Sequence, residues 1–392
     1  MAQIAELTRD AEGAAAVAGG KLRVALLGAT GMVGQQFIRV LRNHPWFEIA
    51  VLAASESSAG KTYREALRGR WAMEFAVPEE LAGVKVLDVQ SVDEIAAQAD
   101  VAFCALNLEK EAVRALEDAY ARRGVWVTSN NSAFRQDPLV PMVIPAANAH
   151  HLGVVPHQRR ARGYDTGAII VKSNCSIQSY VIALEPLRDF GVTRINVFSA
   201  QAISGAGKTF KTWPEMRDNL IPHIGGEEEK SETEPLKIWG EATSDGIVPA
   251  NGPKIRARCV RVGVADGHTA QVTVAFKAVP TAAQILERWE RHRGRAADLP
   301  SAPRRLIHYR PEKDRPQPAL DVMTENGMAV TVGHLRVEPD EATASFTALA
   351  HNAILGAAGG AVWATEAALA RGLLYRRIAP QRKTRPQTAK AL

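Results

Sequence analysis

Short apolar runs alternate with amphipathic segments along the first part of the chain. The run Leu22–Leu27 is typical of a buried strand, and the segment Met32–Arg42 after it has the spacing of an amphipathic helix. The same alternation predicts further strands at Phe47–Ala53, Val84–Leu87, Val101–Ala105, Val125–Val127 and Ala168–Lys172, with helices from Val92, over Glu109–Arg122 and over Ile177–Leu187. Strands that alternate with helices predict an α/β fold with a doubly wound parallel sheet.

Beyond residue 173 the pattern changes to longer segments rich in β-branched residues. They predict strands at Arg194–Ala200, Ile255–Ala265, His268–Phe276 and Met328–Val337. This part of the chain is therefore expected to form a second, α+β domain with a mixed or antiparallel sheet. The last apolar segment, residues 354–375, is rich in Ala and Gly and predicts a C-terminal helix.

The composition is that of an ordinary globular protein of two or three domains, with 392 residues, of which 46% are hydrophobic and 23% charged. Only Cys104, Cys175 and Cys259 are present, without metal-like spacing, which predicts neither a disulfide framework nor a metal site. A reducing cytoplasm suits such a chain. The N-terminus is unlike a signal peptide and no apolar run is long enough to span a membrane, so we expect no membrane association.

The net charge of +6 is concentrated at the C-terminus. Residues 376–392 carry six Lys and Arg and no acid, and subtracting these six from 48 basic residues leaves 42 against 42 acidic residues. The body of the chain is therefore neutral, and we do not expect nucleic acid as a partner. A solvated, disordered tail is the simpler interpretation of residues 376–392, and residues 1–20 are expected to form a disordered leader.

A glycine-rich turn joins the first predicted strand to the first predicted helix. Glycines at such a turn let the backbone approach a pyrophosphate at the helix N-terminus, as in the Rossmann fold. The spacing is Gly-x-x-Gly-x-x-Gly rather than the commoner Gly-x-Gly-x-x-Gly, and a purely structural turn is the alternative. The residues expected at the cofactor are Gly28, Thr30, Gly31, Met32, Val33 and Gly34.

The loop after the second predicted strand bears on the choice of cofactor. It offers the hydroxyls of Ser55, Ser57 and Ser58 together with Lys61, which suit the 2′-phosphate of NADP. Glu56 in the same loop keeps NAD as the alternative, because a carboxylate there binds the ribose hydroxyl of NAD.

Cys175 closes a buried strand and opens a helix-like run. Unpaired backbone N–H groups and the positive end of a helix dipole stabilise a thiolate at such a place, so Cys175 is a candidate nucleophile. A small buried side chain with no chemical role is the alternative.

The pair Asp266-Gly267 lies between two β-branched runs and predicts a tight hairpin. Ala265 would then pair with His268, so that Arg261 and His268 share one face and Gly263 leaves the space between them open. Arg and His on an apolar face need partners, either a ligand or a structural salt bridge.

Three further segments carry candidate polar groups. Gln201 precedes a loop of small residues at 202–207, where the backbone can pass close to a ligand. The acidic run 227–229 with Lys230 precedes a helix predicted over Glu234–Glu241. The segment 130–135 follows a predicted parallel strand, and such folds bind ligands at the carboxyl ends of their strands.

Taken together, these motifs resemble the aspartate-semialdehyde dehydrogenases, particularly their archaeal and fungal branch, and more broadly the glyceraldehyde-3-phosphate-dehydrogenase-like fold. The resemblance covers about residues 21–375, although Ser57, Ser173 and Leu355 stand where other residues are usual. It implies an NADP-binding Rossmann domain of residues 21–172 and 353–375, to which the C-terminal helix returns, and a catalytic and dimerisation domain of residues 173–352.

The resemblance also implies roles for individual residues. Cys175 would be the nucleophile, positioned by Gln201, and His268 the general acid/base, titrating near neutrality. The residues implied to bind substrate are Arg261 at its carboxylate, Glu227 at its amino group, Arg135 and Lys230 at its phosphate, and Asn174. Ser204, Gly205 and Asn352 would approach the nicotinamide.

The reaction implied is the reversible, NADP-dependent reductive dephosphorylation of aspartyl phosphate to aspartate semialdehyde through a cysteine thioester, in lysine, threonine and methionine biosynthesis. A homodimer or homotetramer is implied too. Two alternatives stay open: a CoA-thioester reductase on the same scaffold, such as a malonyl-CoA reductase, and a non-catalytic NADP-binding regulator.

Overall fold

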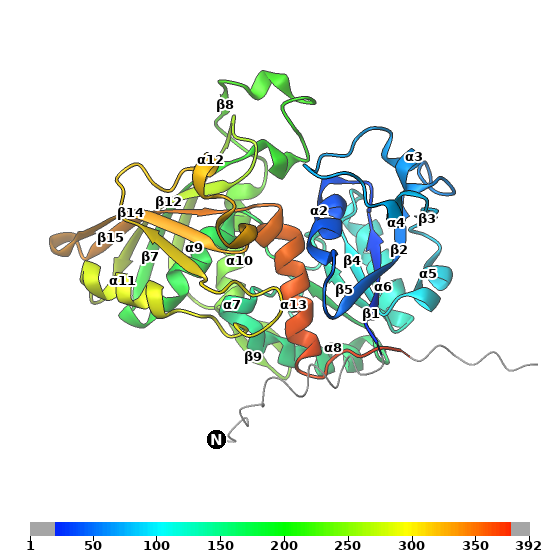
Figure 1. Ribbon diagram of the computed structural model, residues 1–392. Helices are drawn as coiled ribbons and strands as arrows, with labels where there is room; N and C mark the ends of the chain where they lie inside the picture. The colour runs from blue at the N-terminus through cyan, green and yellow to red at the C-terminus, as the bar shows by residue number, and fades with distance from the viewer. Residues whose placement is uncertain (1–19, 378–392) are drawn as a thin grey trace, which may run out of the picture.

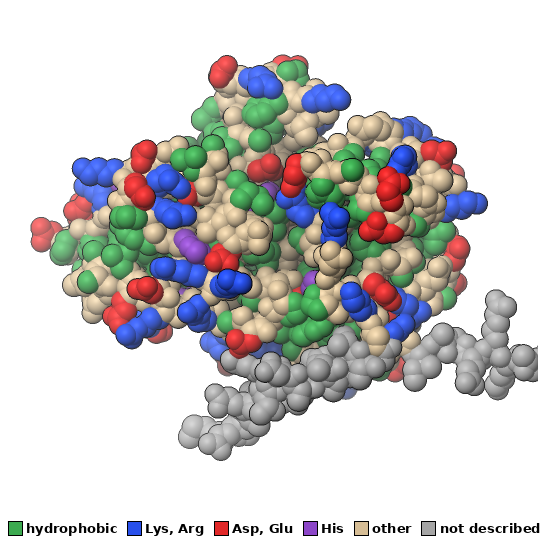
Figure 2. Space-filling model, viewed as in Figure 1, with side chains coloured by type: hydrophobic (Ala, Val, Ile, Leu, Met, Phe, Trp, Pro, Cys, Tyr) green, Lys and Arg blue, Asp and Glu red, His purple; other side chains and the backbone are tan. Residues whose placement is uncertain are grey.

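The computed structural model describes residues 20–377, which form two large sheets and one of two strands, β9 (Glu241–Thr243) and β10 (Gly246–Val248), with helices between and around the large sheets (Figure 1). The predicted leader and basic tail lie outside the described residues, apart from Gly20, Arg376 and Arg377. On the face that Figure 2 shows, acidic and basic side chains are interspersed. Within residues 20–377, no helix has both the length and the apolar character required to cross a membrane.

The first sheet has six parallel strands in the order β3-β2-β1-β4-β5-β6, which is the doubly wound order of a dinucleotide-binding domain. The prediction of this fold is confirmed. Its strands are β1 (Leu22–Leu27), β2 (Phe47–Ala54), β3 (Leu87–Asp88), β4 (Val101–Cys104), β5 (Trp126–Ser129) and β6 (Ala168–Val171). The helices of this domain include α2 (Met32–Leu41), α5 (Val92–Gln98) and α6 (Lys110–Arg122).

The strand predicted at Val84–Leu87 is largely wrong. Only Leu87 and Asp88 join the sheet, as β3. The backbone groups of Val84 and Val86 instead bond to residues 60–63, in the loop after β2. These contacts hold the loop after β2 against the residues that precede β3.

The second sheet is mixed and has seven strands in the order β13-β14-β15-β12-β7-β11-β8, as expected for the second domain. Its strands are β7 (Val192–Gln201), β8 (Leu220–Ile221), β11 (Lys254–Val262), β12 (His268–Phe276), β13 (Ile307–Arg310), β14 (Val330–Glu338) and β15 (Thr343–Ala350). The helices in contact with it are α9 (Ile177–Leu184), α10 (Glu227–Ile238) and α11 (Ala282–Arg291). Shorter elements are α3 (Tyr63–Leu67), α4 (Glu79–Ala82), α7 (Pro145–Asn148), α8 (Val155–Arg162), α12 (Pro318–Asp321), β9 (Glu241–Thr243) and β10 (Gly246–Val248).

The hairpin predicted around Asp266-Gly267 is wrong. β7 lies between β11 and β12, parallel to β11 and antiparallel to β12. The chain leaves β11 at Val262 because the next residues bond to the loop after β7, with Ile203 N–H donating to Val264 O. Nor is Gly263 open, since a Cβ atom there would stand 2.3 Å from the Met216 carbonyl oxygen.

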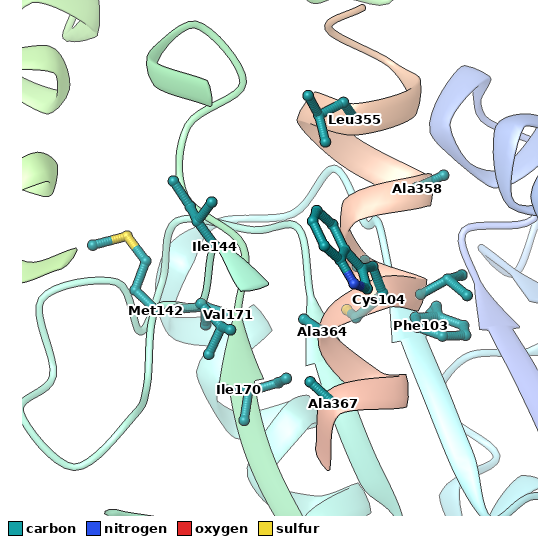
Figure 3. Close-up of a cluster of buried hydrophobic side chains, with 14 of the residues drawn as sticks. Phe103, Cys104, Met142, Ile144, Ile170, Val171, Leu355, Ala358, Ala364 and Ala367 are labelled. Carbon is teal, nitrogen blue, oxygen red and sulfur yellow. The ribbon is translucent and has the colours of Figure 1, made fainter. Parts of the chain in front are cut away.

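The C-terminal segment returns to the first sheet, as predicted, although its helix ends at Leu369. It begins as a π-helical turn, η7 (Ile354–Ala358), and continues as α13 (Gly359–Leu369). Figure 3 shows small side chains of this segment, among them Ala364 and Ala367, beside Ile170 and Val171 of β6. α13 is buried along its whole length and lies between the two sheets (Figure 1), so it connects the two halves of the molecule.

Candidate active site

Cys175 lies between β6 and α9, one residue before Ser176, which caps α9. Its side chain is partly exposed, and its Sγ atom lies 3.4 Å from Nε2 of His268, the first residue of β12. On its other side Cys175 packs against the π-helical turn, where a Cβ atom at Gly356 would stand 2.9 Å from Cys175 Cβ. The nucleophile predicted from the sequence thus has a histidine partner.

The ring of His268 has a defined orientation. The backbone N–H of Ala202 donates to Nδ1 over 3.1 Å, which places the single hydrogen of the neutral ring on Nε2, facing the sulfur. Burial, and then the charges of Arg261 and His351, lower the pKa of His268 to about 3. The expectation that His268 titrates near neutrality is therefore wrong for this state of the protein.

The thiol of Cys175 is also shifted. Burial raises its pKa to about 11, the Glu227 carboxylate adds to the rise, and Arg135 and Arg261 oppose it. The expectation that the start of α9 holds a thiolate is thus wrong in the absence of ligands, because desolvation outweighs the helix terminus.

Glu227, at the start of α10, gathers the predicted substrate-binding groups. Its carboxylate accepts hydrogen bonds from Asn174 Nδ2 at 2.9 and 3.0 Å, from Gln201 Nε2 at 3.2 Å and from Lys230 Nζ at 2.8 Å. Gln201 reaches it from the end of β7. Four residues from three separate segments of the sequence therefore meet beside Cys175, which follows Asn174 directly.

Two arginines complete the charged surroundings. Arg261, near the end of β11, donates from Nη1 to the Ala202 carbonyl oxygen at 2.7 Å. Gly205 leaves room for it, because a Cβ atom there would stand 2.9 Å from both Arg261 Nη1 and His268 Nε2. Arg135 follows β5 and forms a buried ion pair with Glu234 at 2.9 Å. Arg261 and His268 thus meet as predicted, although not through a hairpin.

The glycine-rich turn fits a dinucleotide. Gly28 has a φ of 96°, and a Cβ atom there would stand 2.4 Å from the Ala105 carbonyl oxygen, while one at Gly34 would stand 2.3 Å from the Gly28 oxygen. Gly31 caps α2 without a side-chain hydrogen bond, so the N–H groups of Met32 and Val33 are left for a ligand. Thr30 lies in the same turn.

The loop after β2 presents some of the predicted 2′-phosphate contacts. Ser55 and Ser57 are exposed, with their hydroxyls 3.1 Å apart, and Lys61 Nζ donates to the Ser57 carbonyl oxygen at 2.5 Å. Ser58 is buried, unlike Ser55 and Ser57.

The nicotinamide contacts expected from the second domain lie together. Asn352 donates from Nδ2 to Ser204 Oγ at 2.9 Å and accepts from the Gly267 N–H at 2.9 Å. A cavity of about 410 Å³ separates Ser204 from Met32 of α2, and Asp266 and His351 also line it. The two halves of a cofactor site therefore face one another across this cavity.

Three features of the site were not predicted. Glu234 binds both Arg135 and the backbone N–H of Asn174, Ala202 orients His268, and Gly356 packs on Cys175. Only Glu234 has a sequence signal, because it lies seven residues after Glu227 and so on the same face of one helix. That helix begins at Glu227, and not at Glu234 as predicted.

A doubly wound domain with a glycine-rich turn, joined to a mixed-sheet domain with a cysteine and histidine pair, defines a nicotinamide-dependent dehydrogenase that uses a thiol. Two family models match the chain, the semialdehyde dehydrogenase NAD-binding domain over residues 23–154 and the semialdehyde dehydrogenase dimerisation domain over residues 184–355. The chain belongs to the aspartate-semialdehyde dehydrogenase family.

Relatives of that name support this assignment. The enzyme of Archaeoglobus fulgidus is 40% identical over 341 residues, which cover 86% of this chain and 95% of the relative. That of Schizosaccharomyces pombe is 39% identical over 362 residues, which cover 90% and 99%.

Solved structures of the family share the fold. The aspartate semialdehyde dehydrogenase of Candida albicans with NADP has a TM-score of 0.80 at 32% identity, covering 90% of this chain and all of that one. Aspartate semialdehyde dehydrogenase II of Vibrio cholerae complexed with ASA has a TM-score of 0.69 at 27% identity, covering 89% and 98%.

Proposed function

We propose that this protein is an NADP-dependent, phosphorylating aspartate-semialdehyde dehydrogenase that acts through a thioester on Cys175. The observation that carries the proposal is the pair of Cys175 and His268, 3.4 Å apart, beside Arg135, Arg261 and Glu227. Cationic groups near the nucleophile suit aspartyl phosphate, which has two anionic ends, and the relatives carry the name aspartate-semialdehyde dehydrogenase.

The substrate roles follow from the positions of the charges. Arg261, next to His268, would bind the α-carboxylate, and Glu227 the α-amino group. Lys230 and Arg135 would bind phosphate. Asn174 and Gln201, which both donate to Glu227, would fix the orientation of that carboxylate. These groups hold the carbonyl carbon of the substrate within reach of Cys175.

The chemistry would begin when the Cys175 thiol loses its proton to water, and the thiolate would then add to the aldehyde carbon. The Nε2–H of His268 faces the sulfur and would stabilise first the thiolate and then the oxyanion of the tetrahedral adduct. NADP held at residues 28–34 would supply the hydride acceptor, and loss of hydride from the adduct would leave a thioester on Cys175. Phosphate held by Arg135 and Lys230 attacks that thioester, the C–S bond breaks, and aspartyl phosphate leaves; the biosynthetic direction is the reverse.

The cofactor would lie with its pyrophosphate on residues 28–34. Its nicotinamide would lie near Ser204, Gly205 and Asn352, and its 2′-phosphate near Ser55, Ser57 and Lys61. The family's NAD-binding domain and the relative from Candida albicans with NADP support this placement. Residues 21–172 with 353–375 would form the cofactor domain, and residues 173–352 the catalytic domain.

We further propose a homodimer in the cytoplasm, formed through the outer face of the seven-stranded sheet. Helices α9 and α10 cover the inner face, whereas side chains such as Phe198, Gln271 and Thr273 line an open cavity of about 680 Å³ on the outer face. The match to a dimerisation domain supports this use of the sheet.

The test is NADPH formation from aspartate semialdehyde, measured with and without phosphate. The proposal predicts NADPH formation that depends on phosphate. A thioester reductase would instead oxidise NADPH with malonyl-CoA, and a non-catalytic regulator would do neither. Loss of the activity in Cys175→Ala would assign the reaction to this thiol.

A further inference from the structure

Two carboxylates of helix α10 lie beside the segment between β6 and α9 that contains Cys175. Glu227 and Glu234 are seven residues apart, about two turns, and both are buried. Pro235 inside the helix has no N–H to donate to the Ser231 carbonyl oxygen, and the hydroxyl of Tyr180 on α9 donates to it instead, at 3.0 Å. This contact fixes α10 against α9, which starts just after Cys175.

Both carboxylate oxygens of Glu234 accept hydrogen bonds at the edge of the candidate site. Its side chain is only 1% exposed, Oε1 accepts from Arg135 Nη1 at 2.9 Å, and Oε2 accepts from the backbone N–H of Asn174 at 2.5 Å. It thus connects an arginine of the cofactor domain to the residue before the nucleophile. A buried carboxylate that receives two charge-assisted or backbone donors fixes the positions of both.

The contacts of Arg135 show that its guanidinium, and not its backbone, depends on Glu234. Lys237, one helical turn later, donates to the carbonyl oxygens of Arg135, Asp137 and Val140 at 2.6 to 2.9 Å, so the backbone of this loop is held independently of Glu234. The guanidinium is held by Glu234 on Nη1 and by the Asn130 carbonyl oxygen on Nη2, at 3.0 Å. Its Nε is buried without a hydrogen-bond partner among the described residues, so one donor of the guanidinium is unused.

We infer that Glu234 is a positioning residue that orients the Arg135 guanidinium toward the phosphate of the substrate and holds the backbone of Asn174 beside Cys175. This inference rests on the proposed function. Glu234 would act only through Arg135 and Asn174, without touching substrate or cofactor. Glu234 also balances the charge of Arg135, a group that lowers the pKa of the Cys175 thiol.

The experiment compares three variants of the full chain. Glu234→Gln keeps the shape but replaces one acceptor by an NH₂ group that faces a donor. Glu234→Asp keeps the charge on a shorter side chain. Glu229→Gln is the matched control, because Glu229 is exposed on the same helix. For each variant, the KM for phosphate, the KM for aspartate semialdehyde and kcat are measured, with the thermal midpoint of unfolding as a check of folding.

We expect Glu234→Gln to raise the KM for phosphate by about tenfold, the value of one lost charged hydrogen bond, and the KM for aspartate semialdehyde by much less. Glu234→Asp should recover part of that loss. In an Arg135→Gln background, Glu234→Gln should add little, because the two residues act as a unit. Independent, additive effects of the two substitutions on the KM for phosphate would overturn the inference, as would equal changes in both KM values.

A second readout does not depend on the substrate. The rate of iodoacetamide alkylation of Cys175 is measured against pH. Because Glu234→Gln leaves the charge of Arg135 uncompensated, we expect the midpoint of this profile to fall by about half a unit or more, with no shift in Glu229→Gln. If Glu234→Gln does not fold, Glu234→Asp and Arg135→Gln are compared in the same way. Loss of the positive charge in Arg135→Gln should raise the midpoint, whereas Glu234→Asp keeps its charge and should leave the midpoint in place. An unchanged midpoint in Arg135→Gln contradicts the inference. An enzyme inactive with aspartate semialdehyde but with the expected shift would count against the proposed function and not against the role of Glu234.

Discussion

The sulfur of Cys175 faces the hydrogen-bearing nitrogen of His268 across 3.4 Å. The Ala202 N–H occupies the other ring nitrogen, so His268 has no free site for a second proton while this bond lasts. His268 is therefore arranged to donate a hydrogen bond to a negative sulfur or oxygen, and the ionisation of Cys175 sets how much of the nucleophile is active.

Selective alkylation is the first consequence. Iodoacetamide should label Cys175 well before Cys104 or Cys259 in the folded protein, because the latter two are 0% exposed. The labelling rate should rise steeply above neutral pH, since burial raises the pKa of the Cys175 thiol to about 11. Peptide mapping by mass spectrometry after short exposure checks the order. Equal labelling of Cys175 and Cys104 would identify Cys175 as an ordinary buried thiol.

The stability of the protein should fall on mild acidification, partly through His268. Its folded-state pKa of about 3 lies below the ordinary value of about 6.5, so between these values the unfolded chain binds a proton that the folded chain does not. Stability is therefore lost as the pH falls through this range. From pH 7 to pH 5 the contribution is about 2 kcal/mol. Urea unfolding at both pH values should show His268→Gln losing less stability than the wild type.

The exposed His223 provides the control for this measurement. His223→Gln should lose as much stability between pH 7 and pH 5 as the wild type does. A loss in His268→Gln equal to that in His223→Gln would mean that His268 is protonated in the folded protein.

Local patterns were sufficient to predict most elements of the fold. The six-residue strand β1 and the helix after it follow from an apolar run and a helical period within residues 22–42, and the glycines between them follow from steric limits on the backbone. The hairpin at Asp266-Gly267 failed because the insertion of β7 between β11 and β12 depends on contacts with residues some sixty positions earlier. Short-range turn chemistry carries no information on such an insertion.

The candidate site, like the fold, was predictable only in the part that depends on local sequence. Cys175, His268 and Arg261 were predicted as chemically suited residues, and they meet. Their pKa values were not predictable, because desolvation depends on how the two domains enclose them. Glu234 escaped prediction because its partners, Arg135 and the backbone of Asn174, come close only when helix α10 packs against the loops at the ends of β5 and β6.

Gly356 should be essential for the position of the nucleophile. Because a Cβ atom there would stand 2.9 Å from Cys175 Cβ, Gly356→Ala should push Cys175 and the π-helical turn apart. We expect a loss of kcat of at least about tenfold, with a cost in stability of about 1 to 3 kcal/mol. Gly83→Ala is the control, because a Cβ atom there meets nothing within 4 Å. Steady-state kinetics with thermal unfolding separates the two effects, and an active Gly356→Ala enzyme would show that Cys175 tolerates displacement.

Lys61 should discriminate NADP from NAD. Its Nζ atom donates to the Ser57 carbonyl oxygen, in the loop after β2 where Ser55 and Ser57 are exposed and the 2′-phosphate is expected. Lys61→Ala should raise the KM for NADP by about tenfold and leave the KM for NAD nearly unchanged, since only NADP carries the charge. Initial rates with each cofactor test this. A parallel rise in both KM values would assign Lys61 to the structure of the loop.

Phe198 should hold the proposed dimer together. It is 43% exposed at the outer face of β7, a large apolar side chain in the middle of a seven-stranded sheet. Phe198→Glu would bury an unpaired charge in each half of the proposed interface, and we expect the dimer to dissociate into monomers at micromolar concentration. Light scattering after size-exclusion chromatography measures the mass directly, against 42.4 kDa for one chain. Leu108→Glu, an equally exposed apolar residue at 43% on the first domain, is the matched control and should leave the mass unchanged. A Phe198→Glu dimer as stable as the control would place the interface elsewhere.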